Sequence, residues 1–415
     1  MAHDRTRSTD AALLALILTL QPFAVSQVIG AESRQAQFQV LYSFQGGRDG
    51  IGPNAVIRDT AGNLYGTTGA GGELSCPLNG SPGCGIVFKL SKTGKETVRY
   101  RFSGAQTDQG GPLGGVVRDA AGNLYGTTSG LPLFGGTAFR VDNSGKETVL
   151  YSFRGGADGG SPVAGLVQDA AGNLYGTTVF GGAFGHGVVF KVDLAGDETV
   201  LHSFNGQGDG TNTLAPLIRD ANGNLYGTAS GGGNFRGRCA GSGCGTVFKL
   251  TTNGKLKVLH TFIGGSDGAN PLGLVRDAAG NLFGTASGGG DPDCTVGGLP
   301  GCGVVFKIDT RGTLTVLHTF TGRADGGTPT AGVAQDTTGN LYVGTAFGGA
   351  SGHGVALKLD SVSTLTVLHS FTGGSDGGAP DSLVLDAVGN LYGTAANGGG
   401  QCKDQGCGVV FKITP

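Results

Sequence analysis

The sequence predicts an all-β protein, a seven-bladed β-propeller of four-stranded blades, closed by an N-terminal strand that completes the last blade. Three observations predict this fold. Glycine contributes 85 of the 415 residues, whereas charged residues make up only 14% of the chain. One hexapeptide recurs seven times at intervals of 50 to 60 residues. Each interval contains four short β-patterned runs separated by turn sequences, as a propeller blade requires.

The composition excludes several other classes of protein. Glycine costs about 1 kcal/mol per helical position relative to alanine, so this chain is not helical. Collagen is excluded because no three-residue period exists and only 14 residues are proline. A hydrophobic content of 38%, with 21 Phe and 9 Tyr, can bury a core, so the chain is not disordered. The net charge of -2 and the absence of any Lys/Arg block argue against nucleic acid as a partner.

Residues 1–31 have the pattern of a secretory signal peptide. Arg5 and Arg7 precede an apolar run over residues 11–20, and the small residues Ala24, Ser26 and Ala31 follow it. A transmembrane anchor is the alternative, but spanning a membrane takes about 20 apolar residues. We therefore expect export with cleavage, a secreted, periplasmic or extracellular protein, and no stable insertion into a membrane. No hydrophobic tail follows the last predicted strand, which favours release over surface anchoring.

The repeated hexapeptide, Gly-Asn-Leu-Tyr-Gly-Thr, marks the second strand of each unit. The fifth copy has Phe283 in place of Tyr, and the sixth has Val343 inserted. The seven copies begin at Gly62, Gly122, Gly172, Gly223, Gly280, Gly339 and Gly389. In the third unit the four predicted strands cover residues 163–168, 173–178, 188–192 and 199–204.

Tight turns are predicted between the first and second strands and between the third and fourth. In the first type, an aspartate placed to accept backbone N–H groups precedes a glycine suited to a positive φ. These turn aspartates are Asp59, Asp119, Asp169, Asp220, Asp277, Asp336 and Asp386. In the second type, Asn253-Gly254 between apolar runs is a strong hairpin signal.

Counting strands predicts how the ring closes. The outer-strand pattern occurs at residues 40–44, before the first complete unit, whereas the seventh unit ends on its third strand at Ile413. The N-terminal segment therefore supplies the missing strand of the last blade, which removes two exposed sheet edges. Residues 39–415 are predicted to form one propeller domain, and we expect a monomer.

The ordered set of motifs resembles a known family. Gly-Gly-x-Asp-Gly precedes Asp-x-x-Gly-Asn-Leu-Tyr-Gly-Thr, which precedes Gly-Val-Val-Phe-Lys. This signature resembles the GloVer (Gloeo/Verruco) repeat of exported bacterial choice-of-anchor proteins, and the hairpin is more distantly similar to that of NHL-type propellers. The resemblance implies an extracellular or surface repeat protein, and it implies no catalytic residues.

Eight cysteines occur in closely spaced pairs between the second and third strands. Paired occurrence in an exported protein predicts local disulfides. The predicted pairs are Cys76/Cys84, Cys239/Cys244, Cys294/Cys302 and Cys402/Cys407. Zinc is the alternative, but the spacings lack a second Cys-x-x-Cys or a His pair, so no metal site is predicted. Pairing across blades four and five, or seven and one, stays open.

One rim of the ring is predicted to carry the variable loops and one aspartate per blade, around the channel mouth. Binding surfaces tend to lie on loops above a rigid scaffold, so we place the candidate site there. The rim aspartates are Asp49, Asp108, Asp158, Asp209, Asp267, Asp325 and Asp376. They could bind calcium or a sugar, or they could shape the turns at the blade crossings. The sequence predicts no cofactor, with calcium as the alternative.

Histidines occupy two kinds of position. His202, His260, His318 and His369 replace Tyr42, Tyr100 and Tyr151 on the outer strands. This exchange indicates a half-buried slot with one polar end. His186 and His353 replace the second cysteine in units that lack the pair. Common catalytic motifs such as Gly-x-Ser-x-Gly and His-Glu-x-x-His are absent from the sequence.

Three functions fit this pattern. The favoured one is an exported, non-catalytic repeat protein that presents one rim to a glycan, a peptide or a cell-envelope partner, with carbohydrate or a cell-surface protein as the expected ligand. The first alternative is a calcium-dependent hydrolase or lyase that acts on polysaccharide or a lactone at the channel mouth. The second is a purely structural component of the envelope.

Overall fold

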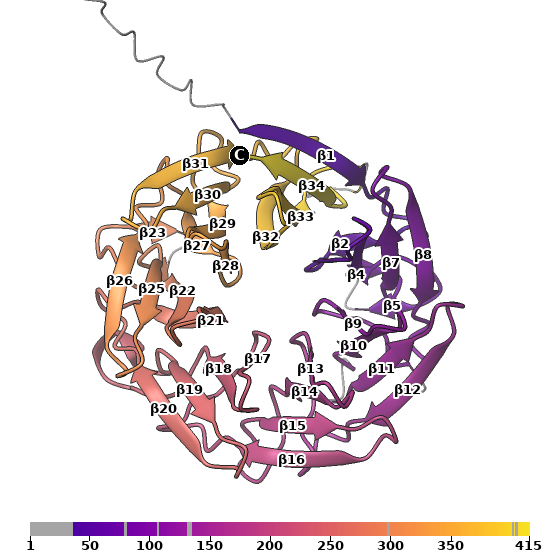
Figure 1. Cartoon of the computed structure of the whole chain (residues 1–415), viewed down its shortest axis with the longest axis horizontal. Helices are drawn as coiled ribbons and strands as arrows, with labels where there is room; N and C mark the ends of the chain where they lie inside the picture. Colours follow the sequence, from indigo (N-terminus) through magenta and orange to yellow (C-terminus); the bar gives the residue numbers. More distant parts are fainter. Residues whose placement is uncertain are drawn as a thin grey trace, which may run out of the picture. The chain divides into compact units, whose positions relative to one another are not determined.

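The computed structural model describes residues 36–78, 81–105, 108–130, 135–296, 299–400, 402 and 406–415. The predicted signal peptide at residues 1–31 lies outside this part of the chain. Residues Gln35–Pro415 form one compact unit. In this unit seven antiparallel sheets stand around a central axis, as predicted, and helix is limited to the short 3-10 turn η1 (Gly237–Cys239) among the described residues (Figure 1).

The first three blades follow one another around the ring. Blade 1 contains β2 (Ile51–Pro53), β3 (Ile57–Arg58), β4 (Leu64–Ala70), β7 (Ile86–Leu90) and β8 (Glu96–Arg101). Blade 2 contains β9 (Val117–Arg118), β10 (Leu124–Thr128), β11 (Thr137–Val141) and β12 (Glu147–Ser152). Blade 3 contains β13 (Val167–Gln168), β14 (Leu174–Thr177), β15 (Val188–Val192) and β16 (Glu198–Ser203).

The next three blades have the same order. Blade 4 contains β17 (Ile218–Arg219), β18 (Leu225–Ala229), β19 (Thr246–Leu250) and β20 (Leu256–Thr261). Blade 5 contains β21 (Ala269–Arg276), β22 (Leu282–Gly288), β25 (Val304–Ile308) and β26 (Leu314–Thr319). Blade 6 contains β27 (Gly327–Pro329), β28 (Ala334–Gln335), β29 (Leu341–Phe347), β30 (Val355–Leu359) and β31 (Leu365–Ser370). In blades 1 and 6 the innermost strand is divided into two segments that pair with the same neighbour.

Blade 7 closes the ring as predicted. It contains β32 (Gly378–Leu385), β33 (Leu391–Asn397) and β34 (Val409–Thr414), and its outermost strand is β1 (Gln37–Ser43). β1 runs antiparallel to β34, with Gln37 opposite Thr414 and Ser43 opposite Val409 (Figure 1). Two-stranded ribbons, β5 (Pro77–Leu78) with β6 (Ser81–Pro82) and β23 (Thr295–Val296) with β24 (Leu299–Pro300), extend two of the cysteine-containing loops.

The predicted hairpin turns are confirmed by their hydrogen bonds. Asp59 accepts the backbone N–H of Asn63 at 2.8 Å, the Asn63 side-chain amide at 2.8 Å and the Tyr65 hydroxyl at 3.1 Å. Burial alone would raise the pKa of these turn carboxyls, but the hydrogen bonds that they accept lower it, to about 2 at Asp336. These aspartates therefore hold the turns.

The core lies between neighbouring blades. The Phe that follows each outer strand is buried and packs against the next blade, so that Phe44 contacts Phe88 with ring centroids 5.3 Å apart. The second glycine of the hexapeptide makes room for the ring, since a Cβ on Gly66 would lie 2.8 Å from Phe88. Burying a phenyl side chain contributes about 1.5–3 kcal/mol, so these pairs join the blades.

The sequence interpretation of Val343 as an insertion is wrong, because Val343 takes the position of the glycine in the other blades without a shift in register. Val343 pairs with Leu357, at the position where other blades pair a glycine with a phenylalanine. The larger residue on the second strand thus accompanies a smaller one on the third. Both side chains are fully buried, and swaps that conserve volume in this way are tolerated by close-packed cores.

The inner strand of blade 3 is shorter than predicted. The prediction covered residues 163–168, whereas β13 contains only Val167–Gln168. Residues 163–165 instead line the central channel, where no neighbouring strand accepts their hydrogen bonds in a ladder. The third strand, β15, has the predicted bounds.

Candidate functional site

The two rims of the ring differ in construction. One rim carries the loops between second and third strands and the turns that lead from each outer strand to the next blade. We call it the loop-rich rim. The other carries the short turns of the two hairpins in each blade, and we call it the hairpin rim. Four blades have a disulfide in the loop-rich rim.

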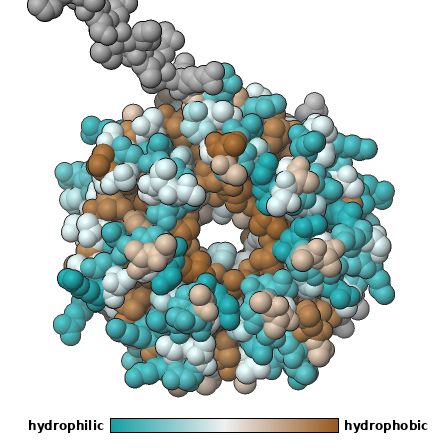
Figure 2. Space-filling view, in the orientation of Figure 1, coloured by the Kyte–Doolittle hydropathy of each residue, from teal (hydrophilic) through white to brown (hydrophobic). Residues whose placement is uncertain are grey.

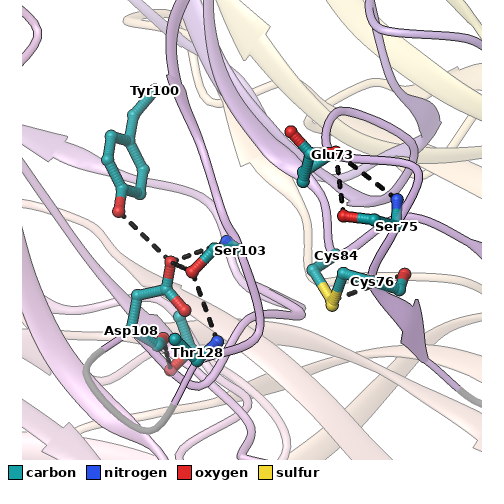
Figure 3. Close-up of a disulfide and its surroundings, with 9 residues drawn as sticks. Glu73, Ser75, Cys76, Cys84, Tyr100, Ser103, Asp108 and Thr128 are labelled. Atoms are coloured by element: carbon teal, nitrogen blue, oxygen red, sulfur yellow. Dashed lines mark hydrogen bonds between the residues drawn. A yellow bond between two sulfur atoms is a disulfide. The ribbon is translucent and has the colours of Figure 1, made fainter.

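The disulfides are local, as predicted. The Cα atoms are 5.6 Å apart in Cys76–Cys84, 5.0 Å in Cys239–Cys244, 5.7 Å in Cys294–Cys302 and 5.2 Å in Cys402–Cys407. This pairing is inconsistent with the zinc alternative and with pairing across blades. Figure 3 shows Cys76–Cys84 beside the turn that contains Asp108.

Each described cystine packs against the turn that follows its own blade. A Cβ on Gly104 would lie 2.2 Å from Cys76 Sγ, and Gly104 has φ +70°. In blade 3 the His186 ring takes this place, since a Cβ on Gly206 would lie 2.3 Å from its Cδ2. His353 covers Gly373 in blade 6 in the same way. The two histidines therefore fill the space of the missing cystines.

The same loops bind the next blade through the backbone. The carbonyl of the second cysteine, or of His353, accepts an N–H from a residue of the segment that enters the next blade. The donors Gly52, Gly111, Asn270, Thr328 and Ala379 pair with Cys407, Cys84, Cys244, Cys302 and His353 at 2.8–3.0 Å. All five donors have positive φ, which costs about 1–2 kcal/mol for the non-glycine ones. The loops are thus tied to the blade junctions.

The seven rim aspartates hold the turns of their own blade crossings. Asp108 accepts the Tyr100 hydroxyl at 3.2 Å, the Ser103 N–H at 2.6 Å and the Ser103 hydroxyl at 2.8 Å (Figure 3). Tyr42 and Tyr151 bind Asp49 and Asp158 at 3.0 and 3.1 Å. These partners are outer-strand residues, so the carboxylates lie toward the outside of the ring. The geometry supports the turn-shaping role, and ligand binding by these residues stays a prediction.

The outer-strand histidines make the equivalent bond. Their Nε2 atoms lie 3.0–3.2 Å from the rim carboxylates, in the pairs His202–Asp209, His260–Asp267, His318–Asp325 and His369–Asp376. Each imidazole is 21% exposed, which confirms the predicted half-buried slot. Among the described residues, no group of three or more His, Cys, Asp or Glu side chains is arranged to hold a metal ion.

A groove of about 670 Å³ opens in the loop-rich rim between blades 6 and 7. We call it the rim groove. Its side chains are Ser43, His353, Ser375, Asn397 and Cys402, and glycines 373, 374, 398–400 and 406 form the rest of the lining. Backbone groups therefore supply much of its hydrogen-bonding capacity, and none of the described lining residues carries a fixed charge.

The central channel is a second cavity, of about 240 Å³. All seven blades contribute to it, mostly through Gly, Ala, Leu, Val and Pro, and Figure 2 shows apolar residues around the opening. Asp381 is the one charged residue among the described residues that line it. Burial, which removes water from the carboxyl group, raises its pKa to about 6. The channel thus departs from sevenfold repetition at blade 7.

Four exposed phenyl rings of the described loop-rich rim were not predicted from the sequence. Phe180, Phe184, Phe235 and Phe347 lie in or beside the loops between second and third strands, and Phe184 is 62% exposed. Aromatic residues within glycine-rich, otherwise polar loops were the signal available. Exposed rings of this kind are common at binding surfaces.

Together, the closed ring and the unequal rims define a repeat propeller with one surface built from fixed loops. The chain belongs to the family described as the Gloeobacter/Verrucomicrobia repeat, whose model matches residues 74–296 and 293–415. This confirms the resemblance inferred from the motifs. No curated protein is significantly similar to the chain in sequence.

Two solved structures from B. thetaiotaomicron are similar in fold. The extracellular domain of a protein described as a hybrid two-component system has a TM-score of 0.55 and 14% identity, covering 91% of this chain and 41% of its own. The extracellular domain of a one-component system has a TM-score of 0.51 and 14% identity, with 92% and 42% covered. The chain therefore spans about two fifths of the length of these proteins. Within its described residues, no helix could span a membrane.

Proposed function

We propose that this protein is an extracellular binding propeller that holds an uncharged glycan in the rim groove. The observation that supports this proposal is the groove itself, a cavity of about 670 Å³ on the rim whose loops are fixed by disulfides and blade-to-blade hydrogen bonds. Sites on rigid supports bind without first ordering the chain, which favours affinity.

The chemistry of the lining favours a glycan over a peptide. Sugar hydroxyls both donate and accept hydrogen bonds, and the groove offers glycine backbone groups with Ser375, Asn397 and His353. Peptides are often recognised through apolar pockets, whereas the described lining of the rim groove contains glycine with Ser, Asn and His rather than large apolar side chains. The exposed rings of Phe184, Phe235 and Phe347 give the same rim apolar faces against which a sugar can pack.

The disulfides support an extracellular setting for this binding. Disulfides form and persist in oxidising compartments and are rare in the cytosol. All eight cysteines of the chain are paired. The signal peptide predicted at residues 1–31 is part of the same proposal.

The test is binding of the purified chain to immobilised neutral polysaccharides such as xylan, mannan and cellulose. Ser375→Tyr places a bulky side chain in the rim groove and is expected to weaken binding at least roughly tenfold by steric exclusion. Ser266→Tyr is the matched control, because Ser266 holds the same turn position before Asp267 that Ser375 holds before Asp376. The proposal fails if no neutral glycan binds, or if both variants bind as the parent does.

A further inference from the structure

A second groove, of about 760 Å³, lies on the hairpin rim between blades 4 and 5. Five basic residues line it, Lys249, Lys255, Lys257, Arg276 and Arg311, and we call it the basic groove. Asp309 is the one acidic residue among its described lining residues. The lining therefore has a strong positive excess in a chain whose net charge is only -2.

Three acidic groups in or beside the groove are held by their own turns. Asp220 accepts the Asn224 side-chain amide at 2.8 Å and the Tyr226 hydroxyl at 3.1 Å. Asp309 Oδ1 accepts the N–H groups of Arg311 at 2.9 Å and Thr313 at 2.8 Å. On the neighbouring turn, both oxygens of Asp277 are occupied by Asn281, at 2.8 and 2.7 Å. In the described part of the structure, no salt bridge joins these carboxylates to the lysines or arginines of the groove. The cations are free to bind an external anion.

Two of the cations are positioned by an aromatic ring. Lys249 Nζ lies 5.3 Å from the centroid of Tyr226, and the guanidinium carbon of Arg276 lies 5.7 Å from the same ring. Cation–π contacts of this kind hold a charge in place without neutralising it. Lys255, Lys257 and Arg311 are exposed around them. The groove thus combines two charges held against a ring with three exposed ones.

The charge at this place is a departure from the repeat. Lys257 stands where blades 1, 2, 3, 5 and 6 have threonine. Thr251 stands where four other blades begin the same turn with aspartate, at Asp142, Asp193, Asp309 and Asp360. Leu256 stands where the first three blades have glutamate. Blade 4 alone therefore loses the acids of this turn and gains a lysine.

We propose that the basic groove binds an acidic polysaccharide through the carboxylates of successive uronate units. Arginine and lysine bind carboxylates through charge-assisted hydrogen bonds, and an open groove between two turns admits a chain that continues beyond both ends. This site is separate from the rim groove, since it lies on the opposite rim and depends on charge.

The groove fits other polyanions less well. Binding single-stranded nucleic acid requires exposed aromatic rings for base stacking, and Tyr226 is only 7% exposed beneath its two cations. Binding an anionic membrane surface requires exposed apolar side chains beside the charges, whereas Leu256, Leu259 and Leu282 in the lining are half-buried or buried.

The experiment measures binding of the full chain to polygalacturonate by calorimetry, with fully methyl-esterified polygalacturonate as the uncharged probe. The parent is expected to bind the acidic polymer, to bind the ester far more weakly, and to lose affinity as salt rises from about 0.05 to 0.5 M. Lys255→Glu with Lys257→Glu is expected to raise Kd at least roughly tenfold. Lys146→Glu with Thr148→Glu places glutamates at the same positions of blade 2 and should leave Kd unchanged.

A second variant tests whether the loss of binding comes from the lost charge rather than from misfolding. Lys257→Thr restores the residue of the other blades, so it should fold normally and still weaken binding severalfold. The proposal is overturned if polygalacturonate does not bind, if the ester binds equally well, or if the blade 2 control loses as much affinity. It is also overturned if an oligonucleotide binds this groove more tightly. Ser375→Tyr should have no effect here, which separates this outcome from that of the rim groove.

Discussion

The outer strands contain two kinds of side-chain pair, and each kind occupies consecutive blades of the ring. Where a blade has Tyr42, Tyr100 or Tyr151, the next outer strand begins with Glu96, Glu147 or Glu198, and each glutamate is close enough to raise the pKa of its tyrosine. Where a blade has histidine, the equivalent residue is Leu256, Leu314, Leu365 or Phe38. Phe38 stacks on His369 with centroids 3.7 Å apart.

The folded structure disfavours a negative charge on each of the three glutamates. Burial, and then the nearby carboxylate of Asp49, raises the pKa of Glu96 to about 7, and Glu147 and Glu198 reach about 7 beside Asp108 and Asp158. One carboxyl oxygen of each glutamate has no hydrogen-bond partner. A protonated glutamate suits this site better than a glutamate anion.

This arrangement predicts a pH-dependent stability. Because the folded pKa of each glutamate lies above its ordinary value of 4.5, its folded state is favoured at low pH, and stability is lost as pH rises through about 7. Replacing all three with glutamine should raise the free energy of unfolding at pH 8 by at least about 1 kcal/mol, a value reduced from the full shifts because water reaches each side chain. Denaturant unfolding of the parent and the triple variant at pH 5 and at pH 8 measures this gain in stability. An equal gain at both pH values would contradict the ionisation argument.

Some residues were predictable from the sequence and others were not. The turn aspartates have short-range partners, such as Asn63 for Asp59, so their role followed from spacing alone. The pairing of Tyr42 with Glu96 joins two blades across 54 residues, and no local pattern indicates it. Asp381 was missed for the same reason, because its setting depends on six other blades.

The cysteine-containing loop is an element that blades 3 and 6 build with a histidine in place of the cystine. In blade 4 the cystine Cys239–Cys244 packs on Gly264, whereas in blade 3 His186 packs on Gly206. A short disulfide loop stabilises mainly by restricting the unfolded chain, and a histidine can replace only its packing.

We therefore expect Cys239→Ala with Cys244→Ala to lower the free energy of unfolding by about 2 kcal/mol while the ring persists. Cys239→Ala with Cys244→His should recover part of this loss by refilling the space over Gly264. Denaturant unfolding of both variants, with and without reductant on the parent, measures the difference. If the histidine variant is the less stable of the two, space filling is not what His186 contributes.

Strands were predictable to different degrees. The third strand, as in β15, has apolar residues on both faces and the predicted bounds, because it is paired on both sides. The inner strand β13 has only two residues, whereas β21 and β32, the innermost strands of blades 5 and 7, have eight each. The number of its backbone groups that find a partner depends on the neighbouring blades, which the sequence pattern of one blade does not contain.

At the scale of the whole molecule, both candidate sites arise where blades meet. The rim groove needs loops of blades 6 and 7, and the basic groove needs turns of blades 4 and 5. The sequence predicted the rim that carries the first groove. It did not predict either groove, because residues such as Lys257 and Arg311 become neighbours only when the ring brings the two blades together.

Ring closure rests on the pairing of β1 with β34, which joins the two ends of the propeller. Deletion of residues 36–44 should lower the free energy of unfolding by more than about 5 kcal/mol, because the loss of buried Phe44 alone is comparable to a Phe→Ala change of about 3–5 kcal/mol. The deletion also exposes the edge of β34, so gel filtration should show association.

A circular permutant distinguishes the effect of losing β1 from the effect of moving the N-terminus, because it keeps β1 but begins the chain elsewhere. Gln37 lies opposite Thr414, so the start of β1 is beside the end of β34. The other blades join their third and fourth strands by tight turns, as Ser91 does with its N–H bonded to the Lys95 carbonyl at 2.9 Å. A chain that begins at residue 45 and carries residues 36–44 after Pro415, through an Asn-Gly turn, should form this seventh hairpin. We expect it to melt as the parent does. If the deletion variant is as stable as the parent, or if the permutant melts at the temperature of the deletion variant, then the pairing of β1 with β34 does not stabilise the closed ring.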